Sequence, residues 1–186
     1  MTLFEYLAIA FSLVFSFAAV RLVGGLPAAL APGRRYWVHV AFVFHELLRV
    51  AAGFWAFWSF RDVAWTFPKY LLALVGPGVV YFLAAALVPE EPAAVESWRE
   101  LYFGVRRRYF LAMVAWALIV AASTTILVQM PWNHPFRRLQ LAFLVFGAVG
   151  AASESPRVHA GLAVASLAFP AIAALTVVLR PGSLAH

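Results

Sequence analysis

The chain has 186 residues, of which 65% are hydrophobic and 12% charged, and it carries a net charge of +6, whereas a soluble domain carries about 25% charged residues. So few charged side chains cannot cover a soluble domain, and the apolar residues gather in blocks of about 20, the length that spans a bilayer core. The lack of cysteine excludes disulfides, thiolate metal sites and cysteine nucleophiles.

The sequence predicts six apolar α-helical spans, at residues 3–23, 36–60, 67–88, 109–129, 139–152 and 158–179. Backbone polar groups inside lipid must be hydrogen-bonded within the protein, so these spans predict an all-α helical bundle that forms one polytopic membrane domain over residues 1–186. The first span contains Glu5 and has no basic residue before it, which favours a retained helix over a signal peptide. Ser155 followed by Pro156 is typical of a helix start and predicts where the sixth span begins.

The longest connection, residues 89–108, has apolar residues at helical spacing and predicts an amphipathic helix lying on the membrane surface. It ends in Arg106, Arg107 and Arg108, which we expect at the interface. Basic residues are more frequent in the first, third and fifth connections, so the positive-inside rule predicts that both termini lie outside. In a membrane protein this basic surplus indicates topology and lipid contact, and we expect no nucleic-acid partner.

Each half of the chain has a proline within its last predicted span. Pro77 lies within the third span between Gly76 and Gly78, and Pro170 lies within the sixth. Proline removes a helical hydrogen bond, so these residues predict a break in the third helix at Pro77. Interruptions at matching positions in two halves are typical of the inverted repeats of transporters, which makes a 3+3 inverted repeat a hypothesis for this chain.

The second span contains a polar cluster within an apolar run, "FHELLRVAAGFW". At 100° per residue, His39, His45, Glu46 and Arg49 fall within about 120° of one another on the helix. Glu46 lies about 15 Å along the span, near the middle of a core of about 30 Å. A charge at that depth must face protein or water, and Glu46 and Arg49, three residues apart, are spaced to form an ion pair.

Three interpretations of this polar stripe remain open. The ion pair can fix helix packing alone. The stripe can instead line a cavity that passes protons or a small solute, with Pro77 beside it and Glu154 and His159 at its mouth. A metal or haem site is the third interpretation: "HELLR" lacks the second histidine of the HExxH zinc pattern, but His39 and His159 are placed near one membrane face and could ligate a b-type haem.

The favoured interpretation is an integral membrane channel or transporter, with no catalytic residue assigned and no cofactor. The alternative is a structural or accessory subunit of a larger membrane complex. The expected partners are the lipid bilayer, further copies of the chain or partner subunits, and a small ion or solute. The sequence resembles small bacterial membrane proteins, which places it in the bacterial inner membrane, but this resemblance implies no function.

Overall fold

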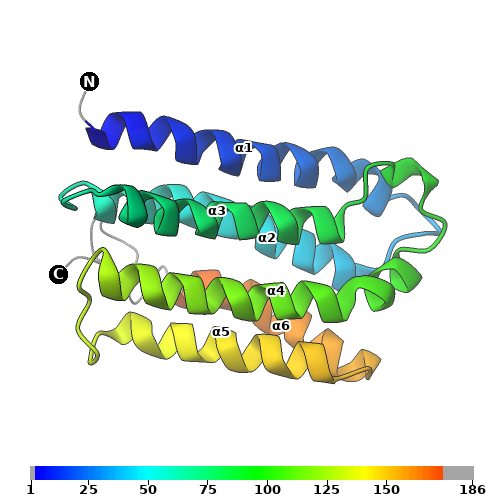
Figure 1. The fold of residues 1–186 in the computed structure, drawn as a ribbon. Coiled ribbons are helices and arrows are strands. Elements are labelled where there is room, and N and C mark those ends of the chain that lie inside the picture. Colours follow the sequence, from blue (N-terminus) through cyan, green and yellow to red (C-terminus); the bar gives the residue numbers. More distant parts are fainter. Residues whose placement is uncertain (1–2, 174–186) are drawn as a thin grey trace.

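The computed structural model describes residues 3–173, and all the regular structure within that range is helical. The helices are α1 (Leu3–Ala29), α2 (Trp37–Phe57), α3 (Phe67–Leu87), α4 (Trp98–Ile126), α5 (Pro135–Ala152) and α6 (Pro156–Ala173), with 3-10 turns η1 (Trp58–Phe60) and η2 (Pro92–Ala94). Consecutive helices run in opposite directions, so the loops after α1, α3 and α5 share one end of the bundle (Figure 1). We call this the arginine-rich end, because Arg34, Arg35 and Arg99 lie there.

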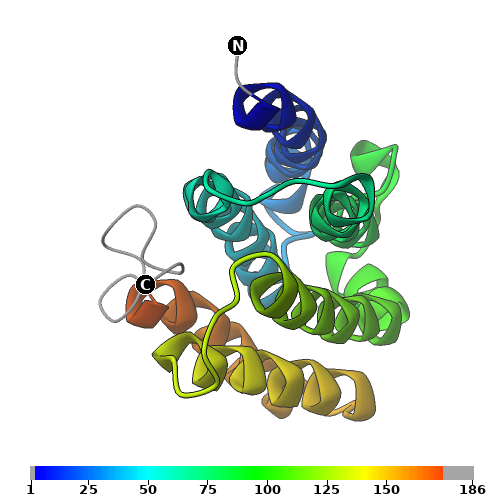
Figure 2. The same ribbon diagram turned by 60° about the vertical axis from the view of Figure 1, so that its left-hand side comes forward.

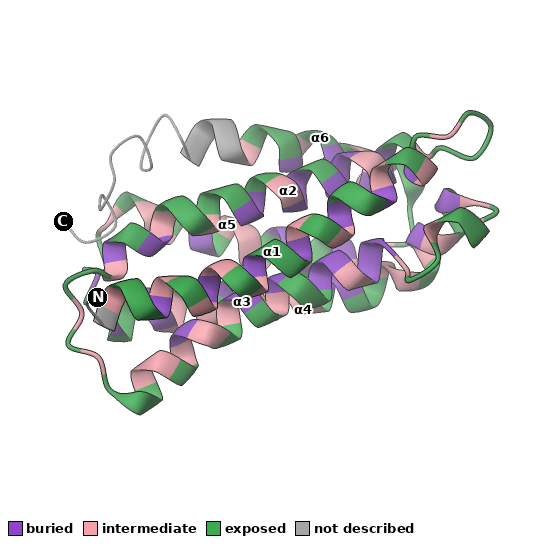
Figure 3. Cartoon of the chain, turned by 90° about the horizontal axis from the view of Figure 1, so that it is seen from above, coloured by how far each residue is buried: buried purple, intermediate pink, exposed green. Residues whose placement is uncertain are grey.

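Helix α2 lies at the centre of the bundle. It packs against α1, α3 and α6, and it approaches α4 over a short stretch, while α4 packs along α3 and α5 (Figure 2). The helix faces that point inward are buried, and those that point outward are exposed although many of their residues are apolar (Figure 3). An apolar outer surface is unfavourable in water and is expected for helices surrounded by lipid.

Among the described residues, four helical segments, corresponding to α1 to α4, are long and apolar enough to cross a membrane. Helices α5 and α6 are shorter, with 18 described residues each, which at 1.5 Å per residue is about 27 Å. The structure therefore supports a helical membrane bundle without confirming six spans. The predicted sixth span also extends to residue 179, and its last part lies outside the described residues.

The sequence predicts an amphipathic helix over residues 89–108 that lies on the membrane and leads into the fourth span, and its surface position is wrong. Only Pro92–Ala94 forms a short turn, and from Trp98 onward these residues belong to α4. The hydroxyl of Ser97 caps that helix by accepting a hydrogen bond from the Glu100 amide at 3.3 Å. Trp98 and Tyr102 are fully buried, so the apolar face of this segment packs into the bundle instead of onto the membrane surface.

The predicted break at Pro77 is also wrong, because α3 continues through this residue to Leu87. A proline within a helix forfeits a backbone hydrogen bond, and the bonds before and after it suffice here to keep the helix continuous. Similarly, α1 includes Pro27 and runs six residues beyond its predicted end at Val23, to Ala29. The prediction that α6 starts at Pro156 is confirmed.

The packing does not confirm an inverted repeat. In the first half α1 packs closely on α3, whereas in the second half the extensive contact is between α4 and α5. Two glycines permit that contact: a Cβ atom on Gly150 would lie 2.4 Å from Phe110 Cδ1, and one on Gly147 would lie 2.7 Å from Val114 Cγ2. The two halves therefore both have a proline in their last span, but their helices do not pack in the same way.

Candidate functional site

The polar stripe of α2 faces the inside of the bundle. Glu46 is completely buried, and His45 and Arg49 expose only 2% and 7% of their surface. Arg49 Nε donates to Glu46 Oε2 at 2.8 Å, which confirms the ion pair expected from their spacing. The two charges compensate one another where neither has water to solvate it.

Two neighbouring helices complete the hydrogen bonds of this pair. The Tyr109 hydroxyl of α4 donates to Glu46 Oε1 at 2.6 Å. Arg49 Nη2 lies 2.7 Å from His45 Nε2, and His45 Nδ1 lies 2.8 Å from the Ser166 carbonyl oxygen of α6. Because a guanidinium only donates and a carbonyl only accepts, His45 must be the neutral tautomer with its proton on Nδ1. We call Tyr109, Glu46, Arg49 and His45 the ion cluster; it joins α2 to α4 and α6.

The Arg49 guanidinium is held on its faces by aromatic rings. Its central carbon lies 4.0 Å from the centre of the Trp116 ring and 5.4 Å from that of Phe143. Stacking of this kind stabilises a cation through the negative face of the ring. Nη1 of Arg49 is buried and has no hydrogen-bond partner among the described residues. One donor of the ion cluster is therefore left unused.

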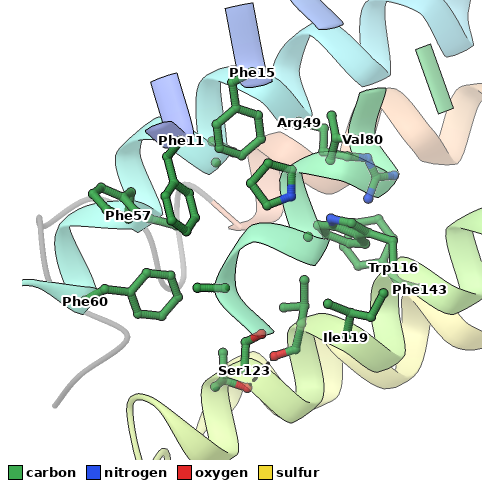
Figure 4. A pocket seen from close by; sticks show the side chains of 18 of the residues that line it. Phe11, Phe15, Arg49, Phe57, Phe60, Val80, Trp116, Ile119, Ser123 and Phe143 are labelled. Carbon is green, nitrogen blue, oxygen red and sulfur yellow. Dashed lines mark hydrogen bonds between the residues drawn. The ribbon is translucent and has the colours of Figure 1, made fainter. Parts of the chain in front are cut away.

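A cavity of about 200 Å³ lies beside the ion cluster, and His45 and Arg49 line it. All six helices contribute to its wall, and most of the wall is aromatic or aliphatic, including Phe11 and Phe15 of α1 (Figure 4). Its other polar side chains include the hydroxyls of Ser123 and Thr124 on α4. Along α2 the cavity runs from the middle of the helix towards the end opposite the arginine-rich end. The result is an apolar chamber with a cation at its inner end.

The structure brings together four of the seven residues predicted for a pathway: His45 and Arg49 line the cavity, Glu46 lies behind them, and Pro77 lines the opposing wall on α3. The other three lie towards the arginine-rich end. Glu154 is exposed and forms an ion pair with Arg106. It therefore does not form the mouth of this cavity, contrary to the prediction.

His39 and His159 both pack against the ring of Tyr102. The Tyr102 ring centre is 6.4 Å from that of His39 and 5.4 Å from that of His159. The Tyr102 hydroxyl bonds His159 Nδ1 at 2.7 Å, and His159 Nε2 bonds the Ser153 carbonyl oxygen at 2.9 Å. His39 packs on Trp98, with both ring nitrogens unpartnered among residues 3–173.

These contacts do not fit a haem held between the two histidines. Both nitrogens of His159 are already engaged, and the Tyr102 ring packs against both imidazole rings. Residues 3–173 also contain no group of three or more histidines or carboxylates placed to hold a metal ion. Within the described residues, His39 and His159 therefore do not fit a bis-histidine haem.

Sequence reasoning missed the partners that other helices supply. Tyr109 appeared only as the first residue of a predicted span, and Ser166 carried no signal at all. A second polar cluster also escaped it: Arg137 of α5 donates to Thr124 Oγ1 at 3.1 Å, Thr125 Oγ1 at 3.0 Å and the Met130 carbonyl oxygen at 2.8 Å. This arginine clamps the end of α4 to the start of α5.

Comparison with known proteins adds no relative: no protein-family model, no curated protein and no solved structure matches the chain.

Proposed function

We propose that the protein is a six-span membrane carrier that binds a small solute in the cavity beside the ion cluster. The observation that carries this proposal is the position of Arg49, a cation near the middle of a helix long enough to cross the membrane, at the inner end of an apolar cavity. Ionisable residues at such depth are costly and are commonly retained for function.

The surfaces of α5 and α6 support six spans. Leu141 and Val145 of α5 are 62% and 56% exposed, and Val164 of α6 is 62% exposed. Both helices also lie along the bundle beside helices that are long enough to span, α5 beside α4 and α6 beside α2 (Figure 1). Apolar side chains that point outward from α5 and α6, as they do from the four longer helices, favour lipid around all six helices. On the positive-inside rule we place the arginine-rich end in the cytoplasm and both termini outside, in a bacterial inner membrane.

The character of the cavity favours a carrier over an open channel. A water-filled ion channel needs polar groups or charges along its length, whereas this cavity has polar side chains mainly at its two ends. Glu46 is fully buried and both its oxygens are bonded, so it does not face a water path in this structure. Proton movement by this cluster would accompany binding of a solute, because Glu46 must change partners to exchange a proton.

The runner-up is a structural or accessory subunit, in a homo-oligomer or with membrane partners. The observation that favours it is the nearly complete hydrogen bonding of the ion cluster, which holds three helices together without any ligand. Buried ion pairs can specify packing in this way. A stable complex with other subunits on purification from native membranes would support this alternative.

Flux into proteoliposomes tests the carrier. The wild type is compared with Ala52→Phe, which places a ring in the cavity wall, and with Ala51→Phe, which alters the adjacent residue, also exposed but outside that wall. Uptake of a panel of small anions, cations and neutral solutes is followed together with internal pH. We expect uptake of at least one solute by the wild type and Ala51→Phe, and at least a tenfold loss in Ala52→Phe. No uptake of any solute or proton under any gradient would refute the carrier.

A further inference from the structure

The unused donor of Arg49 indicates which chemistry the cavity can accept. The side chain of Arg49 is only 4% exposed, and its Nη1 has no partner within the part of the chain that the structure describes. A buried donor without an acceptor is unfavourable, so the site is incomplete as it stands. Nη1 is covered by protein atoms in this structure, but Arg49 lines the cavity, so a turn of the guanidinium would bring this donor to an anionic oxygen there. A guanidinium binds carboxylates particularly well.

The size and walls of the cavity limit the rest of the ligand. An apolar cavity of about 150 Å³ is sufficient to bind benzene, and this cavity measures about 200 Å³. Phe15, Phe57, Trp116 and Phe143 contribute aromatic faces and edges to its wall. Rings packed in this way favour a compact aromatic or branched body. The remaining volume suits one small polar group.

We propose that the cavity binds a small monocarboxylate with a benzene-sized apolar body, whose carboxylate accepts a hydrogen bond from Arg49 Nη1 when the guanidinium turns towards it. The inference rests on the proposed function, because it takes the cavity to be the solute site. It goes further by naming the class of solute and the atom that recognises it.

Charge balance adds a consequence. Arg49 already neutralises Glu46; the other titratable groups bonded to this pair are His45 and Tyr109, while α6 contributes only the Ser166 carbonyl oxygen. The described residues that line the cavity from α1, α3 and α5 are apolar. A second carboxylate would thus be an unpaired buried charge, which is unfavourable. The complex therefore takes up one proton, held by one of the two carboxyl groups.

Equilibrium binding to the purified full chain in detergent tests the inference, with phenylacetate as the ligand and 2-phenylethylamine and toluene as size-matched comparisons. We expect phenylacetate to bind at least tenfold more tightly than either comparison. Because binding takes up a proton, the affinity for phenylacetate should fall up to tenfold for each unit by which the pH is raised. Equal binding of toluene would refute the role of Arg49, and preference for the amine would refute the charge assignment.

Two sets of variants locate the site. Ala52→Phe should weaken phenylacetate binding at least tenfold, and Ala51→Phe should leave it unchanged. Glu46→Gln removes the competing carboxylate, so Arg49 is free to pair with the ligand: we expect tighter binding at pH 7 and a loss of the pH dependence. Weaker binding by a folded Glu46→Gln protein would overturn the inference. If Glu46→Gln does not fold, the two alanine positions and the ligand comparison still decide the outcome.

The outcomes also separate this inference from the proposed function. Transport of some other solute, with no binding of phenylacetate, would refute the inference and leave the carrier intact. Binding of phenylacetate without any flux would refute the carrier and leave the binding site intact.

Discussion

Removal of one hydroxyl, in Tyr109→Phe, tests whether the ion cluster holds a charged carboxylate. The Tyr109 hydroxyl donates to Glu46 Oε1 at 2.6 Å, and both residues are fully buried. The substitution leaves the shape of the core almost unchanged and deprives the carboxylate of one of its two side-chain donors. The substitution should therefore weaken the α2–α4 contact, and the cavity that it leaves is no larger than one oxygen atom.

The expected loss follows from the type of hydrogen bond. A bond to a charged group contributes about 1.5–3 kcal/mol, whereas neutral hydrogen bonds between membrane helices average about 0.6 kcal/mol. We therefore expect Tyr109→Phe to lower the free energy of unfolding by about 2 kcal/mol. Tyr102→Phe is the matched control, since its hydroxyl bonds His159 at 2.7 Å instead of a carboxylate, from an equally buried position on the same helix. It should lose about 0.6 kcal/mol.

The assay is equilibrium unfolding in mixed micelles with increasing dodecyl sulfate, followed by the fluorescence of the seven tryptophans and by helical circular dichroism. The difference between the variants, about 1.4 kcal/mol, corresponds to about tenfold in the unfolding equilibrium. Equal losses in the two variants would show that the bond to Glu46 is no stronger than a neutral one. The ionised Glu46–Arg49 pair, and the charge balance built on it, would then be wrong.

Three further predictions concern packing and topology. Gly147→Ala should destabilise the protein by about 1–3 kcal/mol in the same assay, because its methyl group would meet α4. Arg137→Lys should lower stability by about 1–2 kcal/mol and increase protease cleavage in residues 127–134, because one ammonium cannot replace the guanidinium contacts with the end of α4. In a chain without native cysteine, Glu154→Cys and Trp132→Cys should react with an impermeant maleimide from opposite sides of the membrane.

Each of these has its own control. Gly161→Ala adds the same methyl group where no atom of another helix lies within 4 Å, so it should be neutral or stabilising. A loss equal to that of Gly147→Ala would contradict the packing argument. Unchanged proteolysis of Arg137→Lys would mean that the clamp does not order the loop. Labelling of Glu154→Cys and Trp132→Cys from the same side would show that α5 does not cross the bilayer.

Local features were predictable wherever one helix decides the outcome. Glu46 can pair with Arg49 because side chains three residues apart lie on the same face of a helix. The polar stripe is buried because a charge facing lipid is costly. Helix ends were less predictable. The segment from Trp98 was assigned to the membrane surface because its periodicity gives an apolar face and does not say whether lipid or protein covers that face.

The sequence by itself determined a bundle of long apolar helices and an internally paired acid and base on the second of them, because composition and helical spacing are local properties. Only the tertiary structure decided what surrounds that pair. Tyr109 and Ser166 lie 63 and 121 residues from their partners, and the cavity forms where six helices fail to close completely. Such contacts depend on how the helices cross, and no local pattern in the sequence encodes that crossing.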